Sequence, residues 1–202
     1  MPVRIGCVVE GHGEVESVPV LIRKIAHEFD PGLQVVIPHP VRVTKSTLLK
    51  AGELERAAEL AALNAGVGGG VLVLLDSDED CPAQLGPKLL ERVRLARADM
   101  PSAVVLARRE FESWFLASAE SLRGCRGLPG DLESPDQPEE IAGAKEWLSS
   151  HIRYGAYAST VDQASLTSAL DFALARRAES FDKCYREITL MLETMRLRGK
   201  LA

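Results

Sequence analysis

The stretch Val71-Leu72-Val73-Leu74-Leu75-Asp76-Ser77-Asp78-Glu79-Asp80 decides the fold that this sequence predicts. Its five apolar residues are typical of a strand buried on both faces, as in a parallel sheet. The acids Asp76, Asp78 and Asp80 follow at alternate positions, which places them at the carboxyl end of that strand. Open α/β sheets bind their ligands at this edge. Crowded carboxylates repel one another unless a cation holds them, so we expect Mg²⁺ or Mn²⁺, which prefer oxygen ligands.

The first 122 residues alternate between strand and helix patterns. Strands are predicted at residues 4–9, 35–37, 71–75 and 102–107, and helices at residues 15–29, 46–64, 82–98 and 110–118. This alternation predicts an α/β fold, a Rossmann-like parallel sheet flanked by helices. Because parallel strands end at one edge, we expect Glu10, Asp76 and residues 108–110 to lie near one another.

The remaining third of the sequence has a different character. Residues 123–139 are rich in Gly, Pro and Asp and predict a loop, and helical patterns follow at residues 139–149, 165–176 and 181–197. No strand pattern is evident there. We therefore predict an α/β domain at residues 1–122 and a C-terminal helical extension at residues 123–202 that packs on it.

Composition limits the classes of partner. The net charge is −5, so no global basic field indicates nucleic acid, although a bound metal can supply positive charge locally.

The four cysteines are far apart and form no C-x-x-C pair, which favours reduced thiols and a cytoplasmic location. The first residues resemble a strand rather than a signal peptide, and no apolar run has membrane-spanning length, so we expect no membrane association. The sequence has no G-x-x-x-x-G-K-[ST] loop, so we do not expect the chain itself to be a nucleotide-hydrolysing motor.

Other motifs explain the acidic stretch less well. An EF-hand loop that starts at Asp76 needs glycine at its sixth position and glutamate at its twelfth, where this chain has Cys81 and Pro87. A haloacid-dehalogenase-like phosphatase usually has its D-x-D after the first strand, whereas here it follows the third. Two simpler readings stay open: a solvated acidic turn, and for Glu14 a favourable charge at a helix start.

The acidic pattern resembles the Toprim domain of topoisomerases, primases and overcoming-lysogenization-defect (OLD) nucleases. That domain has a glutamate after its first strand and D-x-D after its third. The chain is similar over nearly its whole length to an uncharacterised bacterial Toprim-like family, whose members often accompany ATPases. The segments that carry this resemblance are Val9-Glu10-Gly11-His12-Gly13-Glu14-Val15-Glu16, Leu75-Asp76-Ser77-Asp78-Glu79-Asp80-Cys81-Pro82, Arg109-Glu110-Phe111-Glu112-Ser113-Trp114-Phe115-Leu116, and residues 143–148, 160–163 and 180–183.

The resemblance implies roles for individual acids. Glu10 matches the Toprim glutamate, a metal ligand or general acid/base, and Glu14 matches the second acid of the OLD-type pattern. Asp76 and Asp78 match D-x-D and would hold one or two Mg²⁺ ions, with Asp80 as a further candidate ligand. The acid after the fourth strand is Glu110 or Glu112, and the sequence does not choose between them.

Several other residues have both a functional and a structural interpretation. Arg108 and Arg109 could bind phosphate or pair with surface acids. Lys145 and Lys183 could contact a phosphate or a transition state, and Lys183 is included among the catalytic candidates; the alternative is an ordinary solvated lysine. Two structural predictions complete the set: Asp162 is a helix N-cap, and Phe111, Trp114 and Phe115 belong to the core.

The acidic constellation and the resemblance together predict a Mg²⁺-dependent nuclease or phosphodiester-transfer protein that acts on nucleic acid, and the resemblance adds an ATPase as a candidate partner. One alternative is a non-catalytic, metal-binding partner subunit of an ATPase system. Another alternative is a small-molecule phosphatase that uses the same metals.

Overall fold

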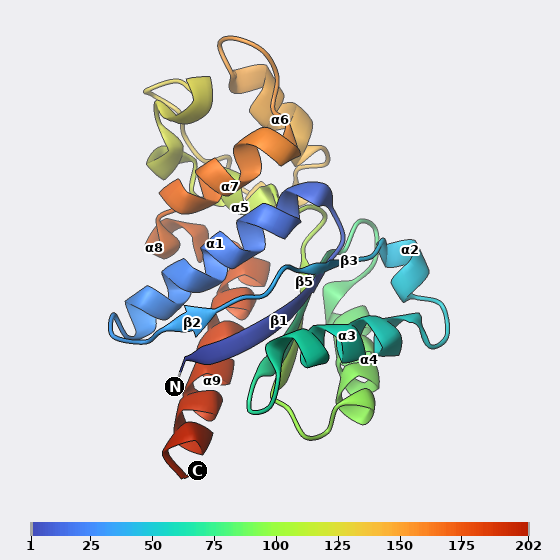
Figure 1. Cartoon of the computed structure of the whole chain (residues 1–202). Helices are drawn as coiled ribbons and strands as arrows, with labels where there is room; N and C mark the ends of the chain where they lie inside the picture. Colours follow the sequence, from blue (N-terminus) through green and yellow to red (C-terminus); the bar gives the residue numbers. More distant parts are fainter. Residues whose placement is uncertain (1, 202) are drawn as a thin grey trace.

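A parallel sheet of five strands forms the centre of the computed structural model, which describes residues 2–201 (Figure 1). The strands pair in the order β2-β1-β4-β5, β3 also pairs with β1, and every pairing is parallel. The predicted parallel α/β architecture is therefore confirmed. The strands are β1 (Val3–Val9), β2 (Val35–Val36), β3 (Val41–Arg42), β4 (Gly70–Asp76) and β5 (Ser102–Ala107).

Helices cover both faces of the sheet (Figure 1). α3 and α4 pack on one face, α1 and α9 pack on the other, and α7 lies along α1. The helices are α1 (His12–Phe29), α2 (Lys45–Leu48), α3 (Glu53–Ala65), α4 (Pro82–Ala96), α5 (Ser113–Ala117), α6 (Ala144–His151), α7 (Ser159–Ala169), α8 (Phe172–Ala175) and α9 (Glu179–Leu201), with short 3-10 turns η1 (Ala119–Leu122), η2 (Cys125–Gly127) and η3 (Pro138–Glu140).

Side-chain alternation along β4 builds two hydrophobic cores. Leu72 and Leu74 belong to the core that α1 and α9 cover, whereas Val71, Val73 and Leu75 belong to the core that α3 and α4 cover. All five side chains are fully buried, so the predicted strand with two buried faces is confirmed. Full burial of an aliphatic side chain of this size contributes about 1.5–3 kcal/mol, which makes β4 a strong organiser of the fold.

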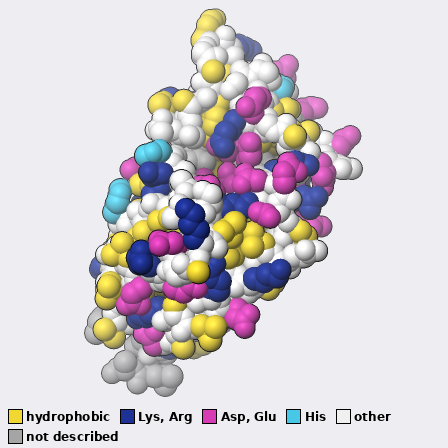
Figure 2. Space-filling view, turned by 90° about the vertical axis from the view of Figure 1, so that its right-hand side faces the viewer, with side chains coloured by type: hydrophobic (Ala, Val, Ile, Leu, Met, Phe, Trp, Pro, Cys, Tyr) yellow, Lys and Arg dark blue, Asp and Glu magenta, His cyan; other side chains and the backbone are white. Residues whose placement is uncertain are grey.

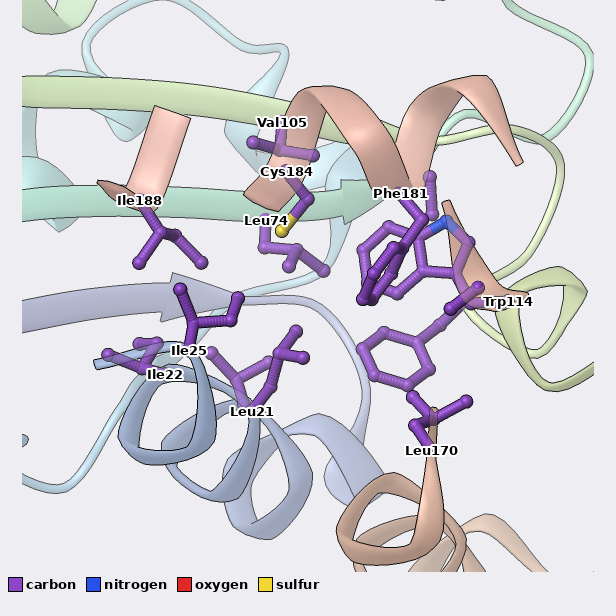
Figure 3. Close-up of a cluster of buried hydrophobic side chains, with 14 of the residues drawn as sticks. Leu21, Ile22, Ile25, Leu74, Val105, Trp114, Leu170, Phe181, Cys184 and Ile188 are labelled. Atoms are coloured by element: carbon purple, nitrogen blue, oxygen red, sulfur yellow. The ribbon is translucent and has the colours of Figure 1, made fainter. Parts of the chain in front are cut away.

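The long C-terminal helix α9 contributes to the same core as the sheet. Phe181, Cys184 and Ile188 of α9 point toward Leu21 and Ile25 of α1 (Figure 3). The predicted core aromatics are confirmed as well, since Phe111, Trp114 and Phe115 are fully buried in this cluster. The N-terminal strands and the C-terminal helix therefore share one continuous apolar interior.

The connection between α1 and β4 differs from the prediction in two places. One strand was expected near residues 35–37, but the segment forms two short strands, because Pro38 and Pro40 lie between β2 and β3 and lack the amide donor of a ladder. A single helix was expected at residues 46–64. It is interrupted between α2 and α3, where Gly52 adopts a left-handed φ of 80° that favours glycine.

Two predictions in the C-terminal third are also wrong. The helix expected at residues 165–176 breaks after Ala169, and the carboxylate of Asp171 caps a new short helix, α8, by accepting from the Ala173 and Leu174 amides. Asp162 is not an N-cap. It lies inside α7, whose N-cap is Ala158, and its carboxylate reaches back to the Ala158 amide at 2.9 Å.

Candidate functional site

The carboxyl ends of the central strands bring the predicted acids to one edge of the sheet. Glu10 follows β1 and Asp76 is the last residue of β4, its neighbour in the sheet. The turn after β5 joins them, because the Phe111 amide donates to the Asp76 Oδ1 atom at 2.7 Å. The two glycines around His12 lead directly into α1, which places Glu14 in the first turn of that helix.

An inner acidic cluster consists of Glu14, Asp76 and Glu112 and surrounds the ammonium group of Lys145. The three carboxylates are almost completely buried, and Asp76 is only 8% exposed. The Lys145 Nζ atom lies 3.6 Å from the Glu112 Oε2 atom and 4.0 Å from the Asp76 Oδ2 atom. Three buried carboxylates against one lysine leave an excess of negative charge inside the protein.

Hydrogen bonds fix the orientation of the cluster. The Glu14 Oε2 atom accepts from the backbone amides of Glu10 at 2.9 Å and Gly11 at 2.6 Å, so the helix start holds this carboxylate in place. The Glu112 Oε1 atom accepts from the Tyr157 hydroxyl at 2.8 Å and from the Gln163 side-chain amide at 3.3 Å. These contacts fix the orientation of the Glu14 and Glu112 carboxylates.

Burial perturbs the protonation of the cluster. It raises the pKa of Asp76 well above the ordinary value, and the charges of Glu14 and Glu112 raise it further. Burial also raises the pKa of Glu112 and of Glu14, although backbone amides oppose the shift at Glu14. Burial lowers the pKa of Lys145, but the carboxylates of Glu112 and Asp76 outweigh that effect and the net shift is upward. Perturbed groups of both signs in one place are typical of functional sites.

Asp78 and Asp80 form an outer acidic pair that a second lysine, Lys45, neutralises. The Lys45 Nζ atom lies 3.0 Å from the Asp78 Oδ2 atom and 2.8 Å from the Asp80 Oδ2 atom, and it also donates to the Ser77 carbonyl. The Lys45 backbone amide donates to the Glu10 Oε1 atom at 3.1 Å. Lys45 therefore contacts both Glu10, which follows the first strand, and the D-x-D motif. The sequence analysis did not predict a role for Lys45 at this site.

The two turns that carry the site are strained and linked. Asp78 and Arg109 both have a positive φ, 49° and 58°, in the left-handed region that side chains rarely adopt. The Asp78 amide donates to the Arg109 carbonyl at 3.0 Å, and the Arg109 amide donates to the Ser77 hydroxyl at 2.8 Å. Strain of this kind is frequent where a protein positions functional groups.

The acids after β5 occupy different environments. Glu112 lies inside the inner cluster, whereas Glu110 is half-buried and its Oε2 atom accepts from the Lys145 backbone amide at 3.2 Å. Arg108 pairs with Glu140 and Arg109 with Glu79, which is the surface pairing that the sequence left open. Figure 2 shows acidic side chains gathered at the middle of one face of the molecule, with Lys and Arg side chains among them.

Lys183 does not reach the acidic groups. It lines a separate cavity between α4 and α9, together with Arg108 and Arg186. Lys145 rather than Lys183 is the lysine that the fold delivers to the inner cluster, although sequence reasoning placed the catalytic role on Lys183.

The donor atoms at this edge of the sheet belong to the class that a divalent cation binds. The donors are carboxylate oxygens, the class that Mg²⁺ and Mn²⁺ prefer. Two of these oxygens, Glu10 Oε2 and Glu112 Oε2, are buried and have no hydrogen-bond partner. Within residues 2–201, no three acidic, histidine or cysteine side chains lie close enough together to hold a metal ion as they stand.

Three residues of the site were missed as such by sequence reasoning. Lys45 follows a two-residue strand inside a proline-rich arm, and no motif indicates its role. Tyr157 and Gln163 lie on the C-terminal segments that cover α1. Gln163 belongs to Thr160-Val161-Asp162-Gln163, a segment that supported the family resemblance, so its sequence context was the one available signal.

Fold and site together define a Rossmann-like α/β protein with a buried acidic cluster at the carboxyl edge of its sheet. A family model described as a domain of unknown function, DUF4276, matches residues 9–188, and the chain belongs to this family. Comparison with curated proteins and with solved structures gave no match. Among the described residues, no helix combines the length and the apolar character needed to cross a bilayer.

Proposed function

We propose that this protein is a Toprim-like, Mg²⁺-dependent phosphodiesterase that cleaves nucleic acid. The observation that carries the proposal is the inner acidic cluster at the sheet edge, where Asp76 and Glu112 are buried beside Glu14 and only one lysine balances them. Burial of several like charges lowers the stability of a protein. Their presence at the carboxyl edge of the sheet, where such folds bind ligands, therefore favours a function that depends on a cation. A divalent cation in such a site supplies Lewis acidity and a water of lowered pKa to phosphodiester hydrolysis.

The residues of the chain have separable roles in this proposal. Asp76, Glu112, Glu14 and Glu10 would hold the metal, and Asp78 would join them where Lys45 releases it. The Phe111 amide and the Tyr157 hydroxyl keep Asp76 and Glu112 oriented. The Lys145 ammonium group lies where it can donate to a phosphate oxygen, and its charge would offset the charge that develops there.

A specific observation supports a second candidate, a metal-independent partner subunit of an ATPase system. Lys45 and Lys145 already provide a cation for the outer pair and for the inner cluster. A protein whose acids are satisfied by its own lysines needs no metal to fold. Measurement of metal binding and of activity separates the two candidates.

The test combines calorimetry with plasmid nicking. Mg²⁺ or Mn²⁺ should bind the wild type, and Asp76→Ala with Asp78→Ala should abolish that binding. The wild type should nick supercoiled plasmid in Mn²⁺, measured with and without an ATPase. Glu10→Gln should lower the nicking rate on the order of 10²-fold or more, because glutamine keeps the volume of the side chain and removes its charge. Glu16→Gln, on the exposed side of α1, is the matched control and should retain the full rate.

Two results would contradict the proposal. If the wild type and the double variant bind metal equally well, Asp76 and Asp78 do not form the metal site. A wild type that nicks no plasmid under either condition would contradict the phosphodiesterase, and if it also binds no metal, the metal-independent partner subunit becomes the favoured candidate.

A further inference from the structure

A cavity of about 490 Å³ lies outside the acidic cluster, between the first turns of α4 and α9. The apolar side chains of Val104 and Leu106 on β5 form its inner wall, and Pro82 and Ala83 at the start of α4 flank them. Ligand sites for small molecules have volumes in this range. The cavity can hold a mononucleotide, and it is far too small for a double helix.

Basic side chains gather around this cavity although the chain as a whole is acidic. Arg108, Arg176, Lys183 and Arg186 are among the residues that line it. Within α9, the Lys183 ammonium group makes no ion pair or hydrogen bond with any residue that the structure describes. Each of these groups can donate to a phosphate, arginine in two parallel hydrogen bonds and lysine as a point charge.

Two of the three acids that line the cavity, Asp182 and Glu139, are already engaged in hydrogen bonds. Asp182 accepts from the Nε atoms of both Arg176 and Arg186, at 2.6 and 2.8 Å, and no described residue accepts from the terminal nitrogens of these two guanidinium groups. Both carboxylate oxygens of Glu139 accept hydrogen bonds from the first turn of α9, one from the Glu179 amide at 2.8 Å and one from the Ser180 amide at 3.0 Å. Lys183 and the terminal nitrogens of Arg176 and Arg186 therefore remain as donors for an anion, whereas Arg108 already pairs with Glu140 and the Arg176 guanidinium also lies over the Tyr185 ring.

The cavity is continuous with the acidic edge of the sheet. A neighbouring hollow of about 240 Å³ is lined by residues 77–80 and by Arg109, and it shares Cys81, Pro82 and Arg108 with the larger cavity. A chain with regularly spaced phosphates could occupy both hollows at once. A single phosphate-bearing metabolite would occupy only one of them.

We propose that the α4–α9 cavity binds one nucleotide unit of a single-stranded nucleic acid, with the phosphate at Lys183 and the arginines and the base on the apolar wall. The base must be unpaired to enter, so the cavity selects single strands over duplex. The inference rests on the proposed function in one respect only, namely that the bound nucleic acid continues from the cavity to the acidic edge of the sheet. Binding in the cavity itself needs neither metal nor catalysis.

The first experiment measures binding of a fluorescein-labelled oligothymidylate by fluorescence anisotropy, in EDTA so that no metal contributes. Lys183→Glu should weaken binding by about 10-fold or more. Lys183→Met, which keeps the aliphatic stem, should weaken it less and lower the slope of log K against log salt by about one unit, as expected for one lost phosphate contact. Lys88→Glu is the control, because Lys88 is exposed on α4 and is not part of the cavity.

The second experiment locates the ligand through Cys81, which is exposed and lines both hollows. Cys7 and Cys184 are buried, and burial raises the pKa of Cys7 to about 12, so neither should react with a thiol reagent near neutral pH. In a Cys125→Ser background, Cys81 should be the reactive thiol. A saturating oligonucleotide should slow its reaction, and duplex DNA of the same length should not.

Several outcomes would overturn the inference: no binding of the oligonucleotide, equal weakening by Lys183→Glu and Lys88→Glu, or unchanged Cys81 reactivity at saturation. Equal competition by polyglutamate would assign the cavity to an acidic peptide instead. The inference and the proposed function fail separately. Cys81 protection without plasmid nicking leaves the cavity assignment intact, whereas plasmid nicking without Cys81 protection by the oligonucleotide removes the cavity assignment alone.

Discussion

Two aspartates of one motif, two residues apart, have opposite environments. Asp76 is 8% exposed, and its pKa is raised by burial and by the neighbouring acids Glu14 and Glu112. The side chain of Asp78 is 62% exposed, and Lys45 pairs with it. Alternation along an extended strand would put positions 76 and 78 on the same side, but β4 ends at Asp76, and the left-handed turn at Asp78 directs its side chain toward Lys45 instead.

Removal of the charge of Asp76 should stabilise the metal-free protein in a pH-dependent way. The pKa of Asp76 is higher in the folded state than in the unfolded state, so between these two values the folded state binds more protons and stability falls as the pH rises. Asp76→Asn removes that loss and can still accept from the Phe111 amide. We expect Asp76→Asn to raise the free energy of unfolding at pH 7 in EDTA by on the order of 1 kcal/mol or more.

Denaturant titrations at several pH values check this expectation. The advantage of Asp76→Asn should shrink as the pH falls and disappear below the ordinary aspartate pKa of 3.8, where the wild-type carboxyl is mostly protonated in both states. Asp78→Asn is the matched control from the same motif, and it should give no such gain, because Asp78 is exposed and paired. If Asp76→Asn is less stable than the wild type at pH 7, the charge of Asp76 stabilises the metal-free protein, and this prediction is wrong.

Among the elements, the packing of β1 against α3 is unusually close. A Cβ atom on Gly6 would lie 2.0 Å from the Ala61 carbonyl oxygen of α3, which is backbone and cannot rotate away. Ala57, Ala58, Ala61 and Ala62 of α3 are buried, so small side chains on the helix match the missing side chain on the strand. The helix therefore lies directly on the strand that leads into Glu10.

Gly6→Ala should separate β1 from α3 and destabilise the protein. Overpacking of a buried site typically costs about 1–3 kcal/mol, and a clash with backbone belongs at the upper end. The measurement is the free energy of unfolding in denaturant. Gly130→Ala is the control, because nothing lies within 4 Å of a Cβ atom there and its φ is not in the left-handed region. Equal stability of the two variants would refute the close contact.

The sequence was sufficient for elements whose pattern is local. The apolar run before Asp76, the alternation of strands with amphipathic helices and the aromatic core after β5 were all predicted correctly, since each depends on periodicity or on a continuous apolar stretch. The interruption at Gly52 and the boundary at Asp171 were missed. In both places a helical pattern continues across a break that one turn residue or one cap determines.

The site was predictable only in part, for a reason that differs between residues. Glu10 and Asp76 could be assigned to one edge, because parallel topology fixes where strands end. The arrangement of Lys45, Lys145 and Tyr157 around these acids could not be predicted, since it depends on tertiary packing between segments more than 30 residues apart in the chain. The choice of Glu112 over Glu110 for the buried position depends on the exact start of α5, which sequence patterns do not resolve.

For the whole molecule, the predicted division at residue 122 can be tested by fragment folding. The isolated segment 139–202 should not fold, because Phe181, Cys184 and Ile188 of α9 are buried against β-strands and α1 rather than against other residues of the segment. We expect no cooperative thermal transition by circular dichroism for this fragment as a monomer. The full chain, measured under identical conditions, is the control, and a cooperative transition of the fragment alone would support an independent helical unit.

The position of α9 in the sequence also determines when this protein can fold during its synthesis. The three longest strands are complete once residue 107 has left the ribosome, but the sheet face that α9 covers stays open until its core residues up to Met195 have emerged. Throughout that interval the nascent chain carries an exposed apolar sheet face, a surface that promotes aggregation and that chaperones recognise. Yield in the cell should therefore depend on holdase chaperones and translation speed more strongly than the stability of the finished protein would indicate.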